Sequence, residues 1–295
     1  MDRFASVKIR GFGTSIFTEM SRLSAEHQAV NLGQGFPDFP GPDFVKEAAK
    51  AAIDADLNQY APSHGTPRLR AAIATTFEKR TGRTVDVDAE ITVTSGATEA
   101  IFDVIQALLD PGDEIILFEP FYDSYKASAV IAGAVPKFVT LQAPDWSFDP
   151  EALRAAITPR TRAILLNTPH NPTGKVFSRD ELELIAGLAQ EHDLVVITDE
   201  VYDRILFDGA EHIWTATLPG MWERTLTINS TGKTFSMTGW KIGYAVGPAS
   251  LNAALRAVHQ FVTFASQTPF QDAMAAALET ADERGYYDQL ARDYT

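Results

Sequence analysis

The sequence predicts an α/β protein of three layers, in which a mostly parallel sheet carries helices on both faces. Short apolar runs alternate with stretches of helical length between residues 90 and 246, and such runs are typical of strands buried on both faces. The chain has 295 residues with 45% apolar content, which is ample for the large core that this architecture needs. Repeats and low-complexity tracts, which would indicate other architectures, are absent from the sequence.

The first third of the chain is expected to be helical and irregular. Residues 1–32 read as an extended arm with one helix around 18–26, and residues 31–40 are too rich in Gly and Pro to be regular. Apolar residues at helical spacing follow Pro42. Pro67 suits the first position of a helix that reaches Arg80.

The alternating pattern then predicts the sheet. Helices are expected at 100–109, up to about Gly133, and at 179–191, and the chain reads as helical from Pro269 to Thr295. We expect strands at residues 91–94, 115–118, 135–140, 163–167, 194–198, 226–229 and 244–246.

Composition and charge exclude several classes of function. A formal charge of −14 argues against a nucleic acid or an anionic membrane as partner, because either would need a basic face. With no cysteine, the chain has no disulfide, thiolate metal site or cysteine nucleophile. Neither a signal peptide nor a long apolar span is visible, and no metal site is predicted. We expect a soluble cytoplasmic protein.

The segment from Ser230 to Tyr244 combines Lys233 and Lys241 with small residues, directly after a predicted strand. Lys233 so placed suits a Schiff-base lysine, with Ser230 and Lys241 forming a phosphate site around it. An ordinary solvated loop is the alternative. A Walker A loop is excluded because Thr227 stands where that motif requires glycine.

Four other strand ends carry residues of related chemistry, and ligands of open parallel sheets bind outside the carboxyl ends of the strands. Each has an ordinary explanation, as a helix cap, a core aromatic, a β-turn or an N-cap, but their joint occurrence favours a pyridoxal phosphate site. They supply a phosphate-binding turn, a stacking aromatic, an amide and a carboxylate with a phenol three residues later: Gly96-Ala97-Thr98, Tyr122, Asn171, and Asp199 with Tyr202.

The runs 30–39 and 230–243 make the sequence resemble class I/II, fold-type-I aminotransferases over essentially its whole length. It is most similar to the branch of kynurenine, glutamine, methionine and succinyl-diaminopimelate aminotransferases. The resemblance implies that Lys233 forms the internal aldimine, that Asp199 pairs with the pyridine nitrogen, and that Asn171 and Tyr202 bond the phenolic oxygen.

The resemblance further implies that Tyr122 stacks on the cofactor ring, while Ala97, Thr98, Ser230 and Lys241 bind its phosphate. Tyr60 would reach the phosphate of the neighbouring subunit's cofactor, so a homodimer is expected. Phe17, Gly33, Asn171 and Phe264 would contact the substrate.

Domain organisation is expected to follow the family. Residues 1–45 would form an N-terminal arm and part of a small domain, 46–280 the cofactor-binding large domain, and 281–295 the start of the connection to a C-terminal small domain missing from these residues. The family's carboxylate-binding arginine lies in that domain, and Arg284 and Arg292 do not match it. Met274 and Leu278 would then lack a covering partner.

The expected reaction moves an amino group from an L-amino acid, of the methionine, glutamine or aromatic type or succinyl-diaminopimelate, to a 2-oxo acid. Kynurenine preference is in doubt because Ala265, and not histidine, follows Phe264. Two alternatives are a carbon–sulfur β-lyase on the same fold and a non-enzymatic effector-binding module. The latter would carry a basic segment before the fold, which the acidic chain does not show.

Overall fold

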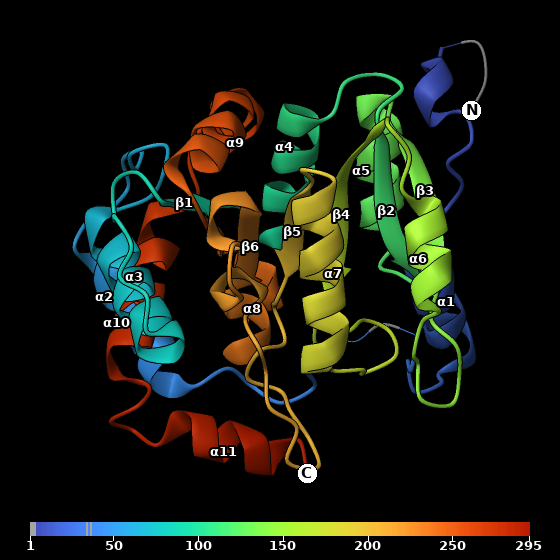
Figure 1. The fold of residues 1–295 in the computed structure, drawn as a ribbon. Helices are drawn as coiled ribbons and strands as arrows, with labels where there is room; N and C mark the ends of the chain where they lie inside the picture. Colours follow the sequence, from blue (N-terminus) through green and yellow to red (C-terminus); the bar gives the residue numbers. More distant parts are fainter. Residues whose placement is uncertain (1–3, 34, 36) are drawn as a thin grey trace.

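The computed structural model describes residues 4–33, 35 and 37–295, and its described part contains one seven-stranded sheet (Figure 1). The strand order is β1-β7-β6-β5-β4-β2-β3, and β7 pairs antiparallel with both of its neighbours while the remaining pairs are parallel. The mostly parallel sheet is therefore confirmed. Gln34 and Phe36 of the 30–39 run lie outside the described residues.

The strands agree with prediction to within two residues at each end. They are β1 (Ile91–Thr94), β2 (Glu114–Glu119), β3 (Val135–Thr140), β4 (Thr161–Asn167), β5 (Val195–Asp199), β6 (Thr225–Ser230) and β7 (Gly243–Val246). The main helices are α1 (Ile16–His27), α2 (Asp43–Asp54), α3 (Pro67–Thr81), α4 (Ala97–Leu108), α5 (Ser124–Ala132), α6 (Pro150–Ala156), α7 (Arg179–Glu191), α8 (Thr231–Thr234), α9 (Ala249–Val262), α10 (Thr268–Thr280) and α11 (Tyr286–Asp293).

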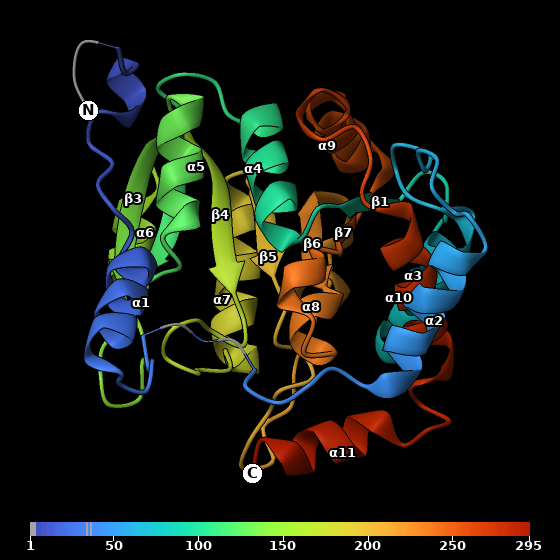
Figure 2. The same ribbon diagram turned by 180° about the vertical axis from the view of Figure 1, so that it is seen from behind.

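Both faces of the sheet are apolar because successive side chains of a strand point to opposite sides. In β4, Ala163 and Leu165 pack into the core under α4, α5 and α9, whereas Ile164 and Leu166 pack into the core under α6 and α7. The two views show these helix groups on opposite sides of the sheet (Figures 1 and 2). The three-layer expectation is confirmed.

A third core lies beyond β1, where α10 packs between α2 and α3 and the sheet edge. Met274 is fully buried there and Leu278 is partly buried against the same cluster. The prediction that these two residues lack a covering partner is wrong. The helices α2 and α3 cover them, although they come from the opposite end of the chain.

The prediction of one helix from Pro269 to Thr295 is also wrong. α10 ends at Thr280, a turn follows, and α11 begins after Gly285, which adopts a left-handed φ of +64°. α11 then ends at Asp293. Glycine reaches this conformation without steric cost, so the chain changes direction there despite favourable helix formers on both sides.

Two segments cross the sheet at the ends of its parallel strands (Figures 1 and 2). One is the segment before α2, whose Phe39 carbonyl accepts a hydrogen bond of 2.5 Å from Ser236 Oγ. The other is α11, whose Tyr294 ring packs edge-on against Phe39 at 5.2 Å. They frame the region where the strand-end residues gather. No helix in the described part of the chain is long and apolar enough to cross a membrane.

Candidate active site

A cavity of about 760 Å³ opens at the carboxyl ends of β4, β5 and β6, where the sequence places its candidate residues. It is lined by all of the predicted site residues except Tyr60 and Phe264. Those lining it are Phe17, Gly33, Gly96, Ala97, Thr98, Tyr122, Asn171, Asp199, Tyr202, Ser230, Lys233 and Lys241. The chain thus brings together side chains that are up to 224 positions apart, from residue 17 to residue 241.

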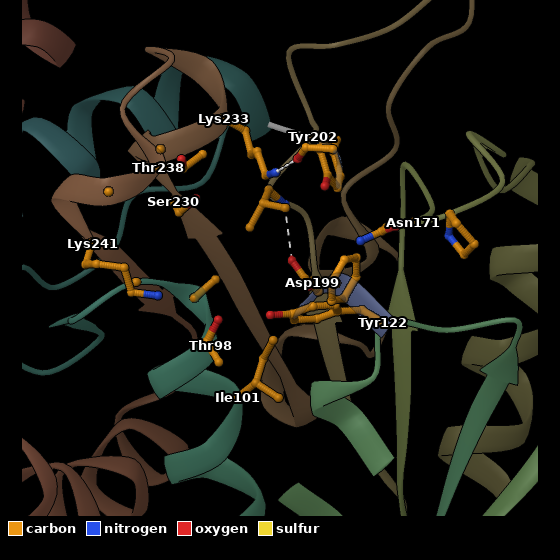
Figure 3. Close-up of a pocket in the computed structure, with 18 of the residues that line it drawn as sticks. Thr98, Ile101, Tyr122, Asn171, Asp199, Tyr202, Ser230, Lys233, Thr238 and Lys241 are labelled. Atoms are coloured by element: carbon orange, nitrogen blue, oxygen red, sulfur yellow. Dashed lines mark hydrogen bonds between the residues drawn. The ribbon is translucent and has the colours of Figure 1, made fainter. Parts of the chain in front are cut away.

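Lys233 lies in α8, a single helical turn that directly follows β6. The sequence gives no helix signal for this turn, and the short helix places the lysine at the cavity (Figure 3). Its Nζ donates a hydrogen bond of 2.6 Å to the Gly35 carbonyl and lies 5.3 Å from the centre of the Tyr202 ring. Burial lowers the pKa of Lys233, although the nearby Asp199 opposes this. Lys233 can therefore reach its neutral, nucleophilic form more readily than a surface lysine.

Asp199 ends β5 and is buried beside the cavity. One carboxylate oxygen, Oδ2, accepts a hydrogen bond of 2.6 Å from Tyr125 Oη, and Oδ1 accepts from the Val201 amide at 3.4 Å. Burial raises the pKa of Asp199 to about 6, against the lowering by these two hydrogen bonds and by Lys233. A carboxylate held this way can pair with a cationic group that enters the cavity.

The planar and phenolic groups lie around Asp199 and Lys233 (Figure 3). Tyr122 packs edge-on against Tyr125 at 5.6 Å and is 6.2 Å from the Phe17 ring, which fixes its position. Asn171 is held in place by its backbone N–H, which donates a hydrogen bond of 2.6 Å to Asn167 Oδ1. Burial raises the pKa of the Tyr202 phenol, so it stays a hydrogen-bond donor. These groups can hold a flat polar ring.

The opposite end of the cavity gathers Ser230, Thr98 and Lys241 (Figure 3). Gly96 precedes α4 with a φ of +82°, and a Cβ there would lie 3.2 Å from Lys241 Nζ. The backbone therefore approaches the lysine as closely as only glycine allows. The first N–H groups of α4 have no intrahelical acceptors, and together with Lys241 they could bind an anion.

Tyr60 and Phe264 lie outside this cavity. Tyr60 is 85% exposed and packs edge-on against the Phe264 ring at 5.5 Å, so the two form one exposed aromatic pair. Their predicted contacts with cofactor and substrate stay predictions. Arg284 lies over the Phe44 ring and Arg292 bonds to Gln289, and neither is among the described residues that line the cavity.

Sequence reasoning missed Tyr125 and Gly35. Tyr125 stands three residues after Tyr122, and this spacing could have indicated a second aromatic directed to the same place. Gly35 carried no comparable signal, because its carbonyl reaches Lys233 through the path of an irregular segment. The apolar wall was missed as well: Ile16, Leu32, Ile101 and Phe121.

The residues present fit pyridoxal phosphate. The cavity holds a half-buried amine, a buried carboxylate, a helix N-terminus beside a second lysine and an aromatic ring, which are the kinds of group that this cofactor requires. At Gly96 the backbone lies so close to the Lys241 side chain that a Cβ there would crowd it, as expected for a close-fitting phosphate site. Asn171 and Tyr202 offer neutral donors at the end of the cavity where Asp199 and Lys233 lie.

Comparisons with known proteins agree with this arrangement. A family model described as aminotransferase class I and II matches residues 27–294. Human kynurenine--oxoglutarate transaminase 1 is 47% identical over 285 residues, covering 92% of this chain and 68% of its own length. A probable N-succinyldiaminopimelate aminotransferase of Mycobacterium tuberculosis is 49% identical over 278 residues, covering 93% of this chain and 70% of its own length.

Solved structures are similar over almost the whole chain. YbdL from Escherichia coli, identified with a methionine aminotransferase function, superimposes with a TM-score of 0.94 at 42% identity, covering 98% of this chain and 75% of that one. The N-succinyldiaminopimelate aminotransferase of Mycobacterium tuberculosis gives 0.94 at 47% identity, with the same shares covered. The chain thus spans about two thirds of the length of its curated relatives.

Proposed function

The chain belongs to the class I and II aminotransferases, which depend on pyridoxal phosphate, and from that premise we propose how its own residues hold the cofactor and which substrates it takes. The reaction moves an amino group from an amino acid to a 2-oxo acid. The observation that carries the assignment of residues is the cavity in which Lys233 and Asp199 stand opposite the anion site of Thr98, Ser230 and Lys241.

Residue roles follow from position. The turn before α4, with Ala97 and Thr98, binds the phosphate together with Ser230 and Lys241. Tyr122 would pack against the cofactor ring, and Asn171 and Tyr202 would donate hydrogen bonds to the phenolic oxygen of the cofactor. Phe17 and Gly33 face the substrate. These assignments are supported by the cavity lining and by the similarity over residues 27–294.

Asp199 serves the ring nitrogen. When bound, pyridoxal phosphate supplies a ring that accepts the electrons left on the substrate when its Cα proton departs. A carboxylate beside the ring nitrogen favours the protonated ring, which is the better electron acceptor. Tyr125 holds this carboxylate from the side away from the solvent, so Asp199 is oriented before any ligand enters.

Lys233 is the covalent attachment point and the base. Its lowered pKa makes the neutral amine, the form that can attack an aldehyde carbon, easier to reach. With cofactor and substrate bound, Lys233 Nζ would accept the proton from the substrate Cα. The Gly35 carbonyl and the Tyr202 ring, both next to Nζ, would keep the amine in the cavity.

The proposed amino donors are methionine, glutamine and aromatic amino acids, or succinyl-diaminopimelate. Support comes from the reactions named for similar proteins and from the apolar wall of Ile16, Leu32, Ile101 and Phe121, which suits an unbranched or aromatic side chain. The test is a panel of these donors with several 2-oxo acids, followed by amino-acid analysis. Pyruvate and ammonia from a cysteine conjugate, without a new amino acid, would indicate the β-lyase instead.

We further propose a homodimer in which Tyr60 completes the phosphate site of the partner. Tyr60, Phe264 and Phe261 are exposed aromatic residues close to one end of α9, and such a patch is typical of an interface. Residues 46–280 are proposed as the cofactor-binding unit, since the cavity residues outside the N-terminal segment all fall within them. A cytoplasmic location, without nucleic acid or membrane as partner, agrees with the charge of −14 and the absence of cysteine.

A further inference from the structure

A charged cluster is buried between α4 and α9, outside the cavity lining. His259 of α9 is fully buried, and its Nδ1 lies 3.0 Å from Glu99 Oε1 and 3.5 Å from Asp103 Oδ2, both on α4. The other ring nitrogen, Nε2, lies 2.7 Å from the Ser63 carbonyl. Asp103 is also fully buried and has no hydrogen-bond donor at normal distance among the described residues.

The contacts define the protonation state of His259. The Ser63 carbonyl can only accept, so Nε2 carries a hydrogen. Glu99 accepts from the Ser95 amide and from Thr263 Oγ1, contacts that favour its anionic form, so Nδ1 carries a hydrogen as well. Burial alone would lower the pKa of His259, but the contacts with Asp103 and Glu99 raise it to about 9. The ring is therefore an imidazolium at neutral pH.

Three segments of the proposed cofactor site meet at this imidazolium. Through Glu99 it reaches the Ser95 amide, at the start of the phosphate-binding turn. Through Nε2 it holds Ser63, in the loop that carries Tyr60. The backbone carbonyl of His259 accepts a hydrogen bond of 3.1 Å from the Phe264 backbone amide. This bond holds the residue whose ring packs against Tyr60.

The direction of the Ser95 amide matters for the phosphate. Glu99 accepts from this N–H and so restrains the peptide that leads into Ala97 and Thr98, two residues that line the cavity. Hydrogen bonds weaken steeply once their angle departs from linearity, so a small rotation of the turn would weaken several contacts together.

We propose that the His259 imidazolium and Glu99 form a positioning pair that fixes the phosphate-binding turn relative to the Tyr60 loop, and so sets the affinity of the site for the cofactor's phosphate group. Neither side chain is among the described residues that line the cavity. This inference rests on the proposed function, because it takes the turn at Ala97 and Thr98 as the phosphate site.

The experiment compares two probes that differ only by the phosphate: pyridoxal phosphate and pyridoxal. Cofactor is removed from the wild type and from His259→Gln and Glu99→Gln, and each probe is titrated by absorbance at neutral pH. His212→Gln is the matched control, because His212 and Glu200 form an equally buried pair, 2.8 Å apart, that does not touch the turn.

We expect the affinity ratio of pyridoxal phosphate to pyridoxal to fall about tenfold in His259→Gln. It should fall about threefold in Glu99→Gln, whose amide oxygen still accepts from Ser95, and stay unchanged in His212→Gln. In the wild type the ratio should decline as the pH rises through about 9, and this step should be missing from His259→Gln. The charged groups that face the ring are Glu99 and Asp103; Arg256, one turn away, instead bonds to Thr92 and Ile91.

Several outcomes would overturn the inference. Equal losses for both probes would mean that His259 acts on the fold in general, and an unchanged ratio in both variants would remove its role. Should His259→Gln fail to fold, Glu99→Gln decides alone. Glu99, Asp103 and His259 could also bind a metal ion. Stoichiometric metal in the wild type that is lost in His259→Gln would show that a metal ion, and not a protonated His259, links these side chains. Wild-type protein that binds neither probe would instead contradict the proposed function.

Discussion

Tyr125 Oη donates a hydrogen bond of 2.6 Å to Asp199 Oδ2, and both side chains are buried. Tyr125 comes from α5, whereas Asp199 ends β5, so the contact exists because α5 packs against this face of the sheet. A buried carboxylate is costly unless it is hydrogen-bonded, and Tyr125 supplies the shorter of the two hydrogen bonds that it accepts.

Removing the phenol tests this relationship. Tyr125→Phe leaves the ring in place but removes the donor, which raises the pKa of Asp199 further and weakens its pairing with the ring nitrogen. We expect kcat/KM to fall about tenfold, the loss that corresponds to one hydrogen bond to a charged group. Steady-state kinetics measure it. Tyr287→Phe, with its ring under Arg204, serves as control and should stay within about twofold.

The pKa of Asp199 predicts how stability depends on pH when the cofactor has been removed. Its folded pKa of about 6 exceeds the value of 3.8 for an unperturbed aspartate, so its contribution to stability is fully present below pH 3.8 and is lost as the pH rises through 6. Relative to Asp199→Asn, the wild type should lose about 3 kcal/mol of unfolding free energy between pH 3 and pH 7. Urea denaturation at each pH measures the difference. A difference between the two proteins that does not change with pH would contradict the burial of this carboxyl group.

The close packing of the phosphate-binding turn predicts the effect of one methyl group. A Cβ on Gly243 of β7 would overlap the Gly96 carbonyl carbon and the Ala97 nitrogen, so Gly243→Ala must displace the turn. We expect at least tenfold weaker pyridoxal phosphate binding and a loss of about 1–3 kcal/mol in unfolding free energy. Gly187→Ala is the control, because its Cβ would meet nothing within 4 Å, and it should stabilise α7 by up to about 1 kcal/mol. Full cofactor affinity in Gly243→Ala would show that the turn does not bind the phosphate.

The proposed role of Tyr60 predicts complementation between subunits. Tyr60→Phe and Lys233→Ala should each be nearly inactive as pure proteins, because each dimer lacks a component of both sites. A mixture unfolded and refolded together should regain up to about a quarter of wild-type activity, since half of the dimers are hybrids with one complete site each. Sedimentation analysis confirms the dimer first. Without any recovery in verified hybrids, Tyr60 does not act across the interface.

The strands and the cavity could be predicted because both depend on local patterns. Apolar runs such as the one around Ile164 identify strands buried on both faces, and the carboxyl ends of neighbouring strands necessarily meet at one edge. Residues at those ends, such as Lys233 and Asp199, therefore reach the same cavity without any knowledge of the packing.

The features that could not be predicted depend mainly on how elements far apart in the sequence pack together. Tyr125 meets Asp199 only because α5 lies over that strand, and Met274 is buried by helices from the other end of the chain. The single turn of α8 is shorter than any periodic pattern can indicate. At Gly285 a left-handed residue interrupts a stretch whose composition favours helix throughout, so local propensity predicted the wrong continuation.

Lys233 is expected to hold the cofactor covalently, and one measurement tests this most directly. Purified protein loaded with pyridoxal phosphate is reduced with borohydride, digested and examined by mass spectrometry, with Lys233→Ala treated in parallel. We predict that the pyridoxyl group is found on the peptide that contains Lys233 and that Lys233→Ala carries none at a stoichiometric level. A pyridoxyl group on Lys241, or equal labelling of Lys233→Ala, would contradict the account.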